Sequence, residues 1–163
     1  MEEENTSKNV FINNFKIGIA IMAYNRPKHL KKLFQALKKQ NIKEFYVFID
    51  GTGNKAIKDN QKKIENLINK INWAKVTVIK RIINLGLKRS IVTAVSEILN
   101  KYEAIILLED DTIPVNGFFE FTIQNLYKFK SDNSIRSICG YQIPSFIKSS
   151  NLIKPVKSSR FIP

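Results

Sequence analysis

The hydrophobic residues of the chain follow two alternating spacings, each typical of one kind of element. Four short runs are almost continuously apolar, as expected for parallel strands covered on both faces; they lie at 16–22, 45–50, 76–79 and 104–108. Between these runs the apolar residues recur every three or four positions, which predicts amphipathic helices. Those helical faces carry Leu30, Leu33, Phe34 and Leu37, then Ile64, Leu67, Ile68 and Ile71, then Ile91, Ala94, Val95 and Ile98.

The last part of the pattern predicts two more elements. Phe119, Ile123 and Leu126 lie at helical spacing, and 137–139 is a short apolar stretch that predicts a fifth strand. Strands that alternate with helices imply right-handed crossovers and a mostly parallel sheet with helices on both faces. We therefore predict an α/β protein with three layers, α/β/α.

The pattern also predicts the domain limits. Residues 1–14 are polar and are expected to form a mobile leader, and 15–147 to form one domain. Residues 148–163 carry little pattern and are expected to be a tail or the start of an incomplete further region.

Polar residues lie at or just beyond the ends of three of the four predicted strands. Asn25 and Arg26 follow the first, Asp50 ends the second, and 109–111 follow the fourth. Because ligands of open parallel sheets bind outside the carboxyl ends of the strands, these residues are expected to meet at one site.

The residues at that fourth exit are three consecutive acids, Glu109, Asp110 and Asp111. Carboxylates crowded together resist ionisation unless a positive partner is near. A hard divalent cation that shares its shell with substrate phosphates would be such a partner. Side-chain alternation predicts that Glu109 and Asp111 point one way and Asp110 the other. The triplet alone also fits a solvated turn or a helix cap.

A second indication of an anionic ligand lies at 84–90, which opens the third predicted helix. Lys88 and Arg89 place two cations at the helix N-terminus, where the macrodipole favours negative charge. A bound anion would offset this cost. The alternative is that both side chains extend into water.

Composition narrows the class of protein. The chain of 163 residues is 44% hydrophobic, which argues for one globular domain and against disorder. The N-terminus is acidic, and no apolar run is long enough to cross a bilayer, so we expect a soluble, cytoplasmic protein. Cys139 is the only cysteine and is expected to be a small buried hydrophobe.

The net charge of +13 invites a nucleic-acid interpretation. Arginine supplies only five of the 27 basic residues, without the aromatic interleaving of base-stacking modules. No specific nucleic-acid partner is therefore expected. The charge would still favour loose attachment to an anionic membrane surface.

Taken in order, these motifs resemble a known family. The AYNRP opening at 23–27, Asp50, the NLGLKRS segment at 84–90 and the acidic triplet are similar to the nucleotide-sugar half of a GT-A glycosyltransferase of family 2. The stretch LEDDTIPVNGFFEF at 108–121 is similar to the metal-motif region of the N-acetylglucosaminyltransferase I group. The resemblance covers roughly 16–145 and implies the GT-A fold.

The resemblance also implies a nucleotide pocket. Ala23, Tyr24, Asn25 and Arg26 would line it, and Asp50 would accept a hydrogen bond from the base. The donor would be a nucleotide-diphosphate sugar, most simply a UDP-sugar.

The same resemblance implies roles for the acids. Asp111 would be the main protein ligand of Mn²⁺ or Mg²⁺, Asp110 would lie near the ribose and donor sugar, and Glu109 beside the sugar or the waters of the metal. Lys88 and Arg89 would lie near the donor phosphates.

The implied activity is inverting transfer of a hexosyl or N-acetylhexosaminyl group to a glycan or other sugar acceptor. Such enzymes use a separate carboxylate as base, and no motif marks one here. Beyond Asp111 the carboxylates are Glu120, in a predicted helix, and Asp132, in a polar turn. We therefore expect donor binding with little or no transfer by this chain alone, as in a fragment or a protein completed by a partner.

Three other classes fit less well. A receiver domain would need a further Asp at a later strand end and a Lys beyond it. A sugar nucleotidyltransferase would open with a Gly-rich loop, and 23–27 contain no glycine. A basic, non-enzymatic binding module would leave the order of the acids unexplained.

Overall fold

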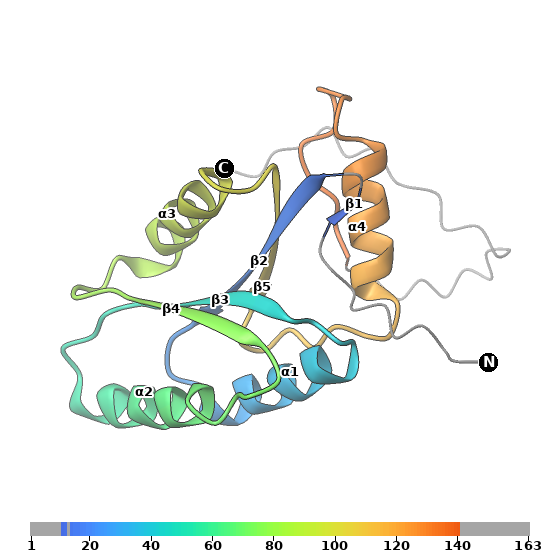
Figure 1. Ribbon diagram of the computed structural model, residues 1–163. Coiled ribbons are helices and arrows are strands. Elements are labelled where there is room, and N and C mark those ends of the chain that lie inside the picture. The colour runs from blue at the N-terminus through green and yellow to red at the C-terminus, as the bar shows by residue number, and fades with distance from the viewer. Residues whose placement is uncertain (1–10, 13, 141–163) are drawn as a thin grey trace, which may run out of the picture.

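A computed structural model describes residues 11–12 and 14–140, which form five strands and four helices (Figure 1). Their bounds, in chain order, are β1 Phe11–Ile12, β2 Phe15–Ala23, α1 Pro27–Lys39, β3 Glu44–Ile49, α2 Lys55–Ile68, β4 Lys75–Lys80, α3 Gly86–Leu99, β5 Ala104–Glu109 and α4 Phe118–Lys128. The four predicted helices and the first four predicted strands are confirmed.

Four strands form a parallel sheet in the order β5-β2-β3-β4. The chain runs outward from β2 to β3 and β4, and then returns across the sheet to place β5 on the other side of β2. The carboxyl ends of β2 and β5 therefore flank the point where the winding direction reverses. Open α/β sheets bind their ligands in the crevice at such a point.

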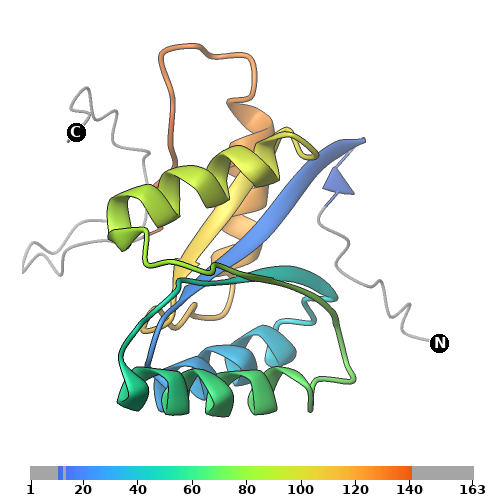
Figure 2. The ribbon, with the colours of Figure 1, turned by 90° about the vertical axis from the view of Figure 1, so that its left-hand side faces the viewer.

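Helices cover both faces of the sheet, as predicted. On one face Ile17, Ile19 and Ile21 of β2 pack in a core with α1, α2 and Phe119 of α4. On the other face Ala20 and Met22 pack with residues of α3. Figure 2 shows α3 on one side of the sheet, with α1 and α2 on the other. The nearly continuous apolar run of β2 thus reflects burial on both faces.

The predicted strand at 137–139 is wrong, because these residues lie outside any strand. Cys139 is exposed, which also corrects its predicted burial. Two apolar residues were too short a run to indicate a strand. The fifth strand is instead β1, inside the segment predicted as a leader, and it pairs antiparallel with the start of β2. The connecting turn uses Asn14 at φ 68°, a left-handed conformation that Asn tolerates.

The remaining predictions about the chain ends fall outside the described residues. They concern 1–10, 13 and 141–163, which include the end of the predicted domain at 147 and the tail at 148–163. Across the part of the chain that the structure describes, no helix has both the length and the apolar character needed to cross a membrane.

Candidate functional site

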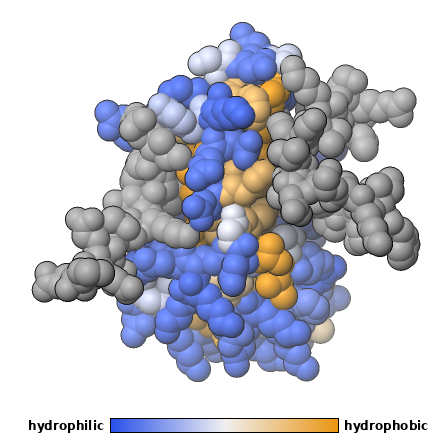
Figure 3. All heavy atoms as spheres, turned by 90° about the vertical axis from the view of Figure 1, so that its right-hand side faces the viewer, coloured by the Kyte–Doolittle hydropathy of each residue, from blue (hydrophilic) through white to orange (hydrophobic). Residues whose placement is uncertain are grey.

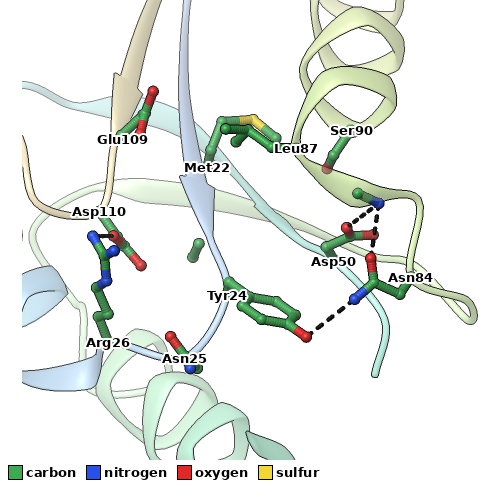
Figure 4. Close-up of a pocket in the computed structure, with 12 residues that line it drawn as sticks. Met22, Tyr24, Asn25, Arg26, Asp50, Asn84, Leu87, Ser90, Glu109 and Asp110 are labelled. Atoms are coloured by element: carbon green, nitrogen blue, oxygen red, sulfur yellow. Dashed lines mark hydrogen bonds and ion pairs between the residues drawn. The ribbon is translucent and has the colours of Figure 1, made fainter. Parts of the chain in front are cut away.

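A pocket of about 350 Å³ lies at the carboxyl edge of the parallel strands (Figure 4). It is lined by Met22, Ala23, Tyr24, Asn25, Arg26, Asp50, Asn84, Gly86, Leu87, Ser90, Glu109 and Asp110. These residues come from the ends of β2, β3 and β5 and from the start of α3. The predicted convergence of polar strand exits is therefore present in the structure.

The β2 exit forms one wall of the pocket. β2 ends at Ala23, and Pro27 begins α1, where its missing N–H is no loss because the first helical amides have no intrahelical acceptor. Between these residues the hydroxyl of Tyr24 accepts a hydrogen bond from Asn84 Nδ2 at 3.0 Å. This bond ties the β2 exit to the loop before α3 across the pocket.

Asp50 links the β3 exit to the N-terminus of α3. Its Oδ1 accepts hydrogen bonds from the amides of Gly51 and Leu85, both at 3.0 Å, and its Oδ2 accepts one from Gly86 at 3.1 Å. Leu85, at the cap position of α3, makes no side-chain capping bond, and no acid lies in the first turn of the helix. Asp50 therefore supplies the cap from another strand.

This capping bears on the predicted anion site at α3. The sequence predicts that an anion offsets the charge of Lys88 and Arg89 at the helix N-terminus. In the structure a carboxylate of the chain itself, Asp50, lies at that end. Lys88 and Arg89 are exposed and are not among the residues that line the pocket. Their predicted contact with donor phosphates stays a prediction.

The side chains of the acidic triplet do not point in the predicted directions. β5 ends at Glu109, and the amide of Thr112 donates to the carbonyl of Glu109 at 3.0 Å, so the chain turns within the triplet. Strand alternation therefore stops. Asp110 and Asp111 both contact Nη1 of Arg26, with Asp110 Oδ1 at 3.4 Å. Figure 4 shows Glu109 pointing away from Asp110 and Arg26. Because Asp110 and Asp111 contact the same Arg26 nitrogen, the prediction that these two side chains point opposite ways is wrong.

Asp110 is the least solvated acid of the triplet. Its side chain is 9% exposed, against 45% for Asp111. Burial raises the pKa of the Asp110 carboxyl, while the Arg26 guanidinium and the backbone amide of Tyr24 act in the opposite direction. A buried carboxylate of this kind gains from a further positive charge in the pocket.

The donor set fits a hard divalent metal. Asp110 and Asp111 already direct carboxylate oxygens at one cationic group, the Arg26 guanidinium. Sites for Mg²⁺ commonly combine one or two carboxylates with waters and substrate phosphates. Among the described residues there is no group of three or more His, Cys, Asp or Glu side chains placed to hold a metal.

The structure thus brings most of the predicted residues together. Ala23, Tyr24, Asn25, Arg26, Asp50, Glu109 and Asp110 line the pocket. Asp111 does not line it but joins it through Arg26. The sequence did not identify five of the wall residues, and all of them except Met22 lie in the NLGLKRS segment that it singled out; they are Met22, Asn84, Gly86, Leu87 and Ser90.

The chain is similar in fold to a solved structure and in sequence pattern to a protein family. A solved structure of the mannosyltransferase PcManGT from Pyrobaculum calidifontis, in complex with GDP-Man and Mn²⁺, matches with a TM-score of 0.53 at 13% identity. The match covers 74% of this chain and 33% of that one, and it confirms the α/β fold of the GT-A type. No curated protein sequence is detectably similar to the chain. The model of the family described as Glycosyl transferase family 2 matches residues 18–156, and the chain belongs to that family.

Proposed function

We propose that the pocket binds a nucleotide-diphosphate sugar together with Mn²⁺ or Mg²⁺, and that the protein takes part in glycosyl transfer. One observation carries this proposal: Asp110 and Asp111 converge on a single cationic group beside a pocket at the reversal point of the sheet. In a chain of glycosyl transferase family 2, this is the arrangement expected of a metal–diphosphate site.

The nucleoside would occupy the part of the pocket between the β2 exit and α3. Met22 and Leu87 offer apolar surface there, and Tyr24 and Asn25 offer polar groups. Each Asp50 oxygen carries two lone pairs, so the carboxylate can accept a bond from a base in addition to its backbone amides. A volume of about 350 Å³ is at the lower end for small-ligand pockets. Because the pocket is small, we propose uracil as the base.

The diphosphate would lie near Arg26 and the acids. A divalent metal held by Asp111 and Asp110 would neutralise the departing diphosphate as a Lewis acid. Arg26, half exposed beside both carboxylates, is free to turn towards phosphate oxygens once another cation takes its place. Glu109 faces the pocket from the end of β5, where it can hydrogen-bond the donor sugar or metal-bound water.

Calorimetry with nucleotides tests the donor site. UDP, GDP and ADP are titrated into the protein with and without Mn²⁺, since the similar mannosyltransferase structure contains GDP-Man. We expect UDP to bind most tightly and to require the metal. Asp111→Ala should weaken metal-dependent UDP binding at least about tenfold. Asp59→Ala, which removes an exposed acid on α2, is the matched control and should leave binding unchanged.

Two results would overturn this proposal. One is nucleotide binding that is equally strong without metal, and the other is equal affinity in the Asp111→Ala variant and the control. Tighter binding of GDP than of UDP would retain the metal–diphosphate site and reject uracil. A separate assay with a UDP-sugar and sugar acceptors measures transfer. We expect donor binding without multiple turnovers, because neither Glu120 on α4 nor Asp132 lines the pocket.

A further inference from the structure

Among the described residues, positive charge is concentrated in one layer. α1 contains five lysines and no acid, and the stretch from the start of α2 to Lys70 contains five lysines and two acids. By contrast, α4 carries one Lys and one Glu. The layer of α1 and α2 occupies the lower part of the molecule in Figure 1, and the same region is mostly hydrophilic in Figure 3. Much of the net charge of +13 therefore faces one side.

The two acids of this layer do not neutralise its centre. Glu65 pairs with Lys80 of β4 at 2.8 Å, and Asp59 lies 4.0 Å from Lys62, its neighbour on the same helix. Neither acid lines the groove that runs between α1 and α2.

That groove is wide and cationic. It has a volume of about 620 Å³ and is lined by Lys28 and Lys31 of α1, by Lys63 of α2 and by Lys70 just beyond α2. None of the described residues that line it carries a carboxylate. Side chains of like charge that share a groove repel one another, so an external anion is the partner that lowers the energy of this surface. We call this groove, with its four lysines, the basic groove.

We propose that the basic groove and the surrounding face of α1 and α2 dock on a membrane surface through anionic lipid headgroups. Each lysine near such a surface adds attraction without needing a fixed geometry, which suits long, flexible side chains on two helices. Leu67 is only partly exposed, and the other groove residues are polar, charged or proline. The attachment is therefore electrostatic, reversible and sensitive to salt.

Nucleic acid fits this face less well. Single strands are held by aromatic platforms as well as charge, and within the described part of the chain no aromatic residue other than His29 lines the groove. Arginine, which reads bases and phosphates in a fixed planar geometry, occurs in the groove only as Arg26, which is paired with acids of the pocket.

Vesicle sedimentation tests the proposal. The protein is mixed with vesicles of neutral phosphatidylcholine, or of phosphatidylcholine with about a third phosphatidylglycerol, in low and high salt. We expect binding to the anionic vesicles only, lost in high salt. The double variant Lys63→Gln/Lys70→Gln should bind them about 30-fold more weakly, because each lysine near the surface contributes about 1 kcal/mol.

The matched control is Lys101→Gln/Lys128→Gln, which removes the same charge from outside the face of α1 and α2. It should keep most of the binding. Equal losses in the two variants would mean that net charge alone attracts the protein, and would overturn the proposal. So would equal binding to neutral vesicles, or release of the protein from anionic vesicles by a low concentration of oligonucleotide or of inorganic phosphate. Arg26 and Asn25 are left unchanged because they also line the pocket, so the outcome is independent of donor binding.

Discussion

Replacing Asp50 tests whether one carboxylate holds the β3 exit and α3 together. Its two oxygens accept hydrogen bonds from the amides of Gly51, Leu85 and Gly86 at 3.0–3.1 Å, and the residue is 9% exposed. Asp50→Ala would remove all three bonds and leave the N-terminus of α3 without its negative cap. We therefore expect a loss of stability even in the absence of any ligand.

The size of the loss follows from what each amide retains. The Gly86 amide also donates to Asn84 Oδ1 at 2.8 Å, and the Gly51 amide also donates to the Ile83 carbonyl at 3.2 Å. The Leu85 amide depends most on the carboxylate. One charge-assisted hydrogen bond contributes about 1.5–3 kcal/mol, and a charge at a helix terminus about 0.3–1 kcal/mol. The free energy of unfolding should fall by about 2–4 kcal/mol.

Urea unfolding followed by circular dichroism measures this change. For a domain of this size the loss corresponds to a decrease in Tm of about 5–15 °C. Asp50→Asn keeps one acceptor oxygen and should lose roughly half as much. Asp59→Ala removes an acid whose side chain is 55% exposed, and should change stability by less than about 0.5 kcal/mol. If Asp50→Ala is as stable as this control, the capping argument is wrong.

Three further substitutions probe the same site. Gly51→Ala would place a Cβ 2.4 Å from the backbone of Ile83 and should cost about 1–3 kcal/mol in urea unfolding, whereas Gly53→Ala, with nothing within 4 Å, should be neutral or slightly stabilising. Burial raises the pKa of Asp110, so the stability that its neutral carboxyl contributes at low pH is lost as pH rises through that pKa. When Tm is measured against pH without metal, Asp110→Asn should not show this decrease in Tm. Arg26→Ala removes the cation between two carboxylates, so Mn²⁺ should bind the nucleotide-free protein about 2–5-fold more tightly in a paramagnetic resonance titration. A stability curve for Asp110→Asn that parallels the wild type, or weaker Mn²⁺ binding in Arg26→Ala, would contradict the respective argument.

The fold could be predicted because its signals are local. The continuous apolar run of β2 and the spacing of Leu30, Leu33 and Leu37 in α1 each reflect the faces that those elements bury. The pattern predicted a mostly parallel sheet but neither the order of its strands nor their register, since both depend on pairings between distant segments. The strand predicted at 137–139 is wrong because so short an apolar run carries too little periodicity to distinguish a strand from an exposed loop.

The sequence predicted which residues share the pocket, but not which of them contact one another. Residues at strand exits share an edge by topology, which brought Asn25, Asp50 and Asp110 into one pocket. The contacts within it span large separations, as with Arg26 and the acids of the β5 exit more than 80 residues away. Side-chain alternation also failed where β5 ended, because the rule holds only while the backbone stays extended.

The two buried acids of the pocket, Asp50 and Asp110, differ in how far the fold satisfies them. Asp50 accepts three backbone hydrogen bonds at 3.0–3.1 Å, and its charge stabilises a helix terminus. Asp110 contacts Arg26 at 3.4 Å, and burial still raises its pKa. A carboxylate that already accepts three backbone hydrogen bonds gains little from another cation, whereas one that remains short of positive charge gains much. The structure therefore favours Asp110, with Asp111 beside it, over Asp50 as the place where a cation adds the most stability.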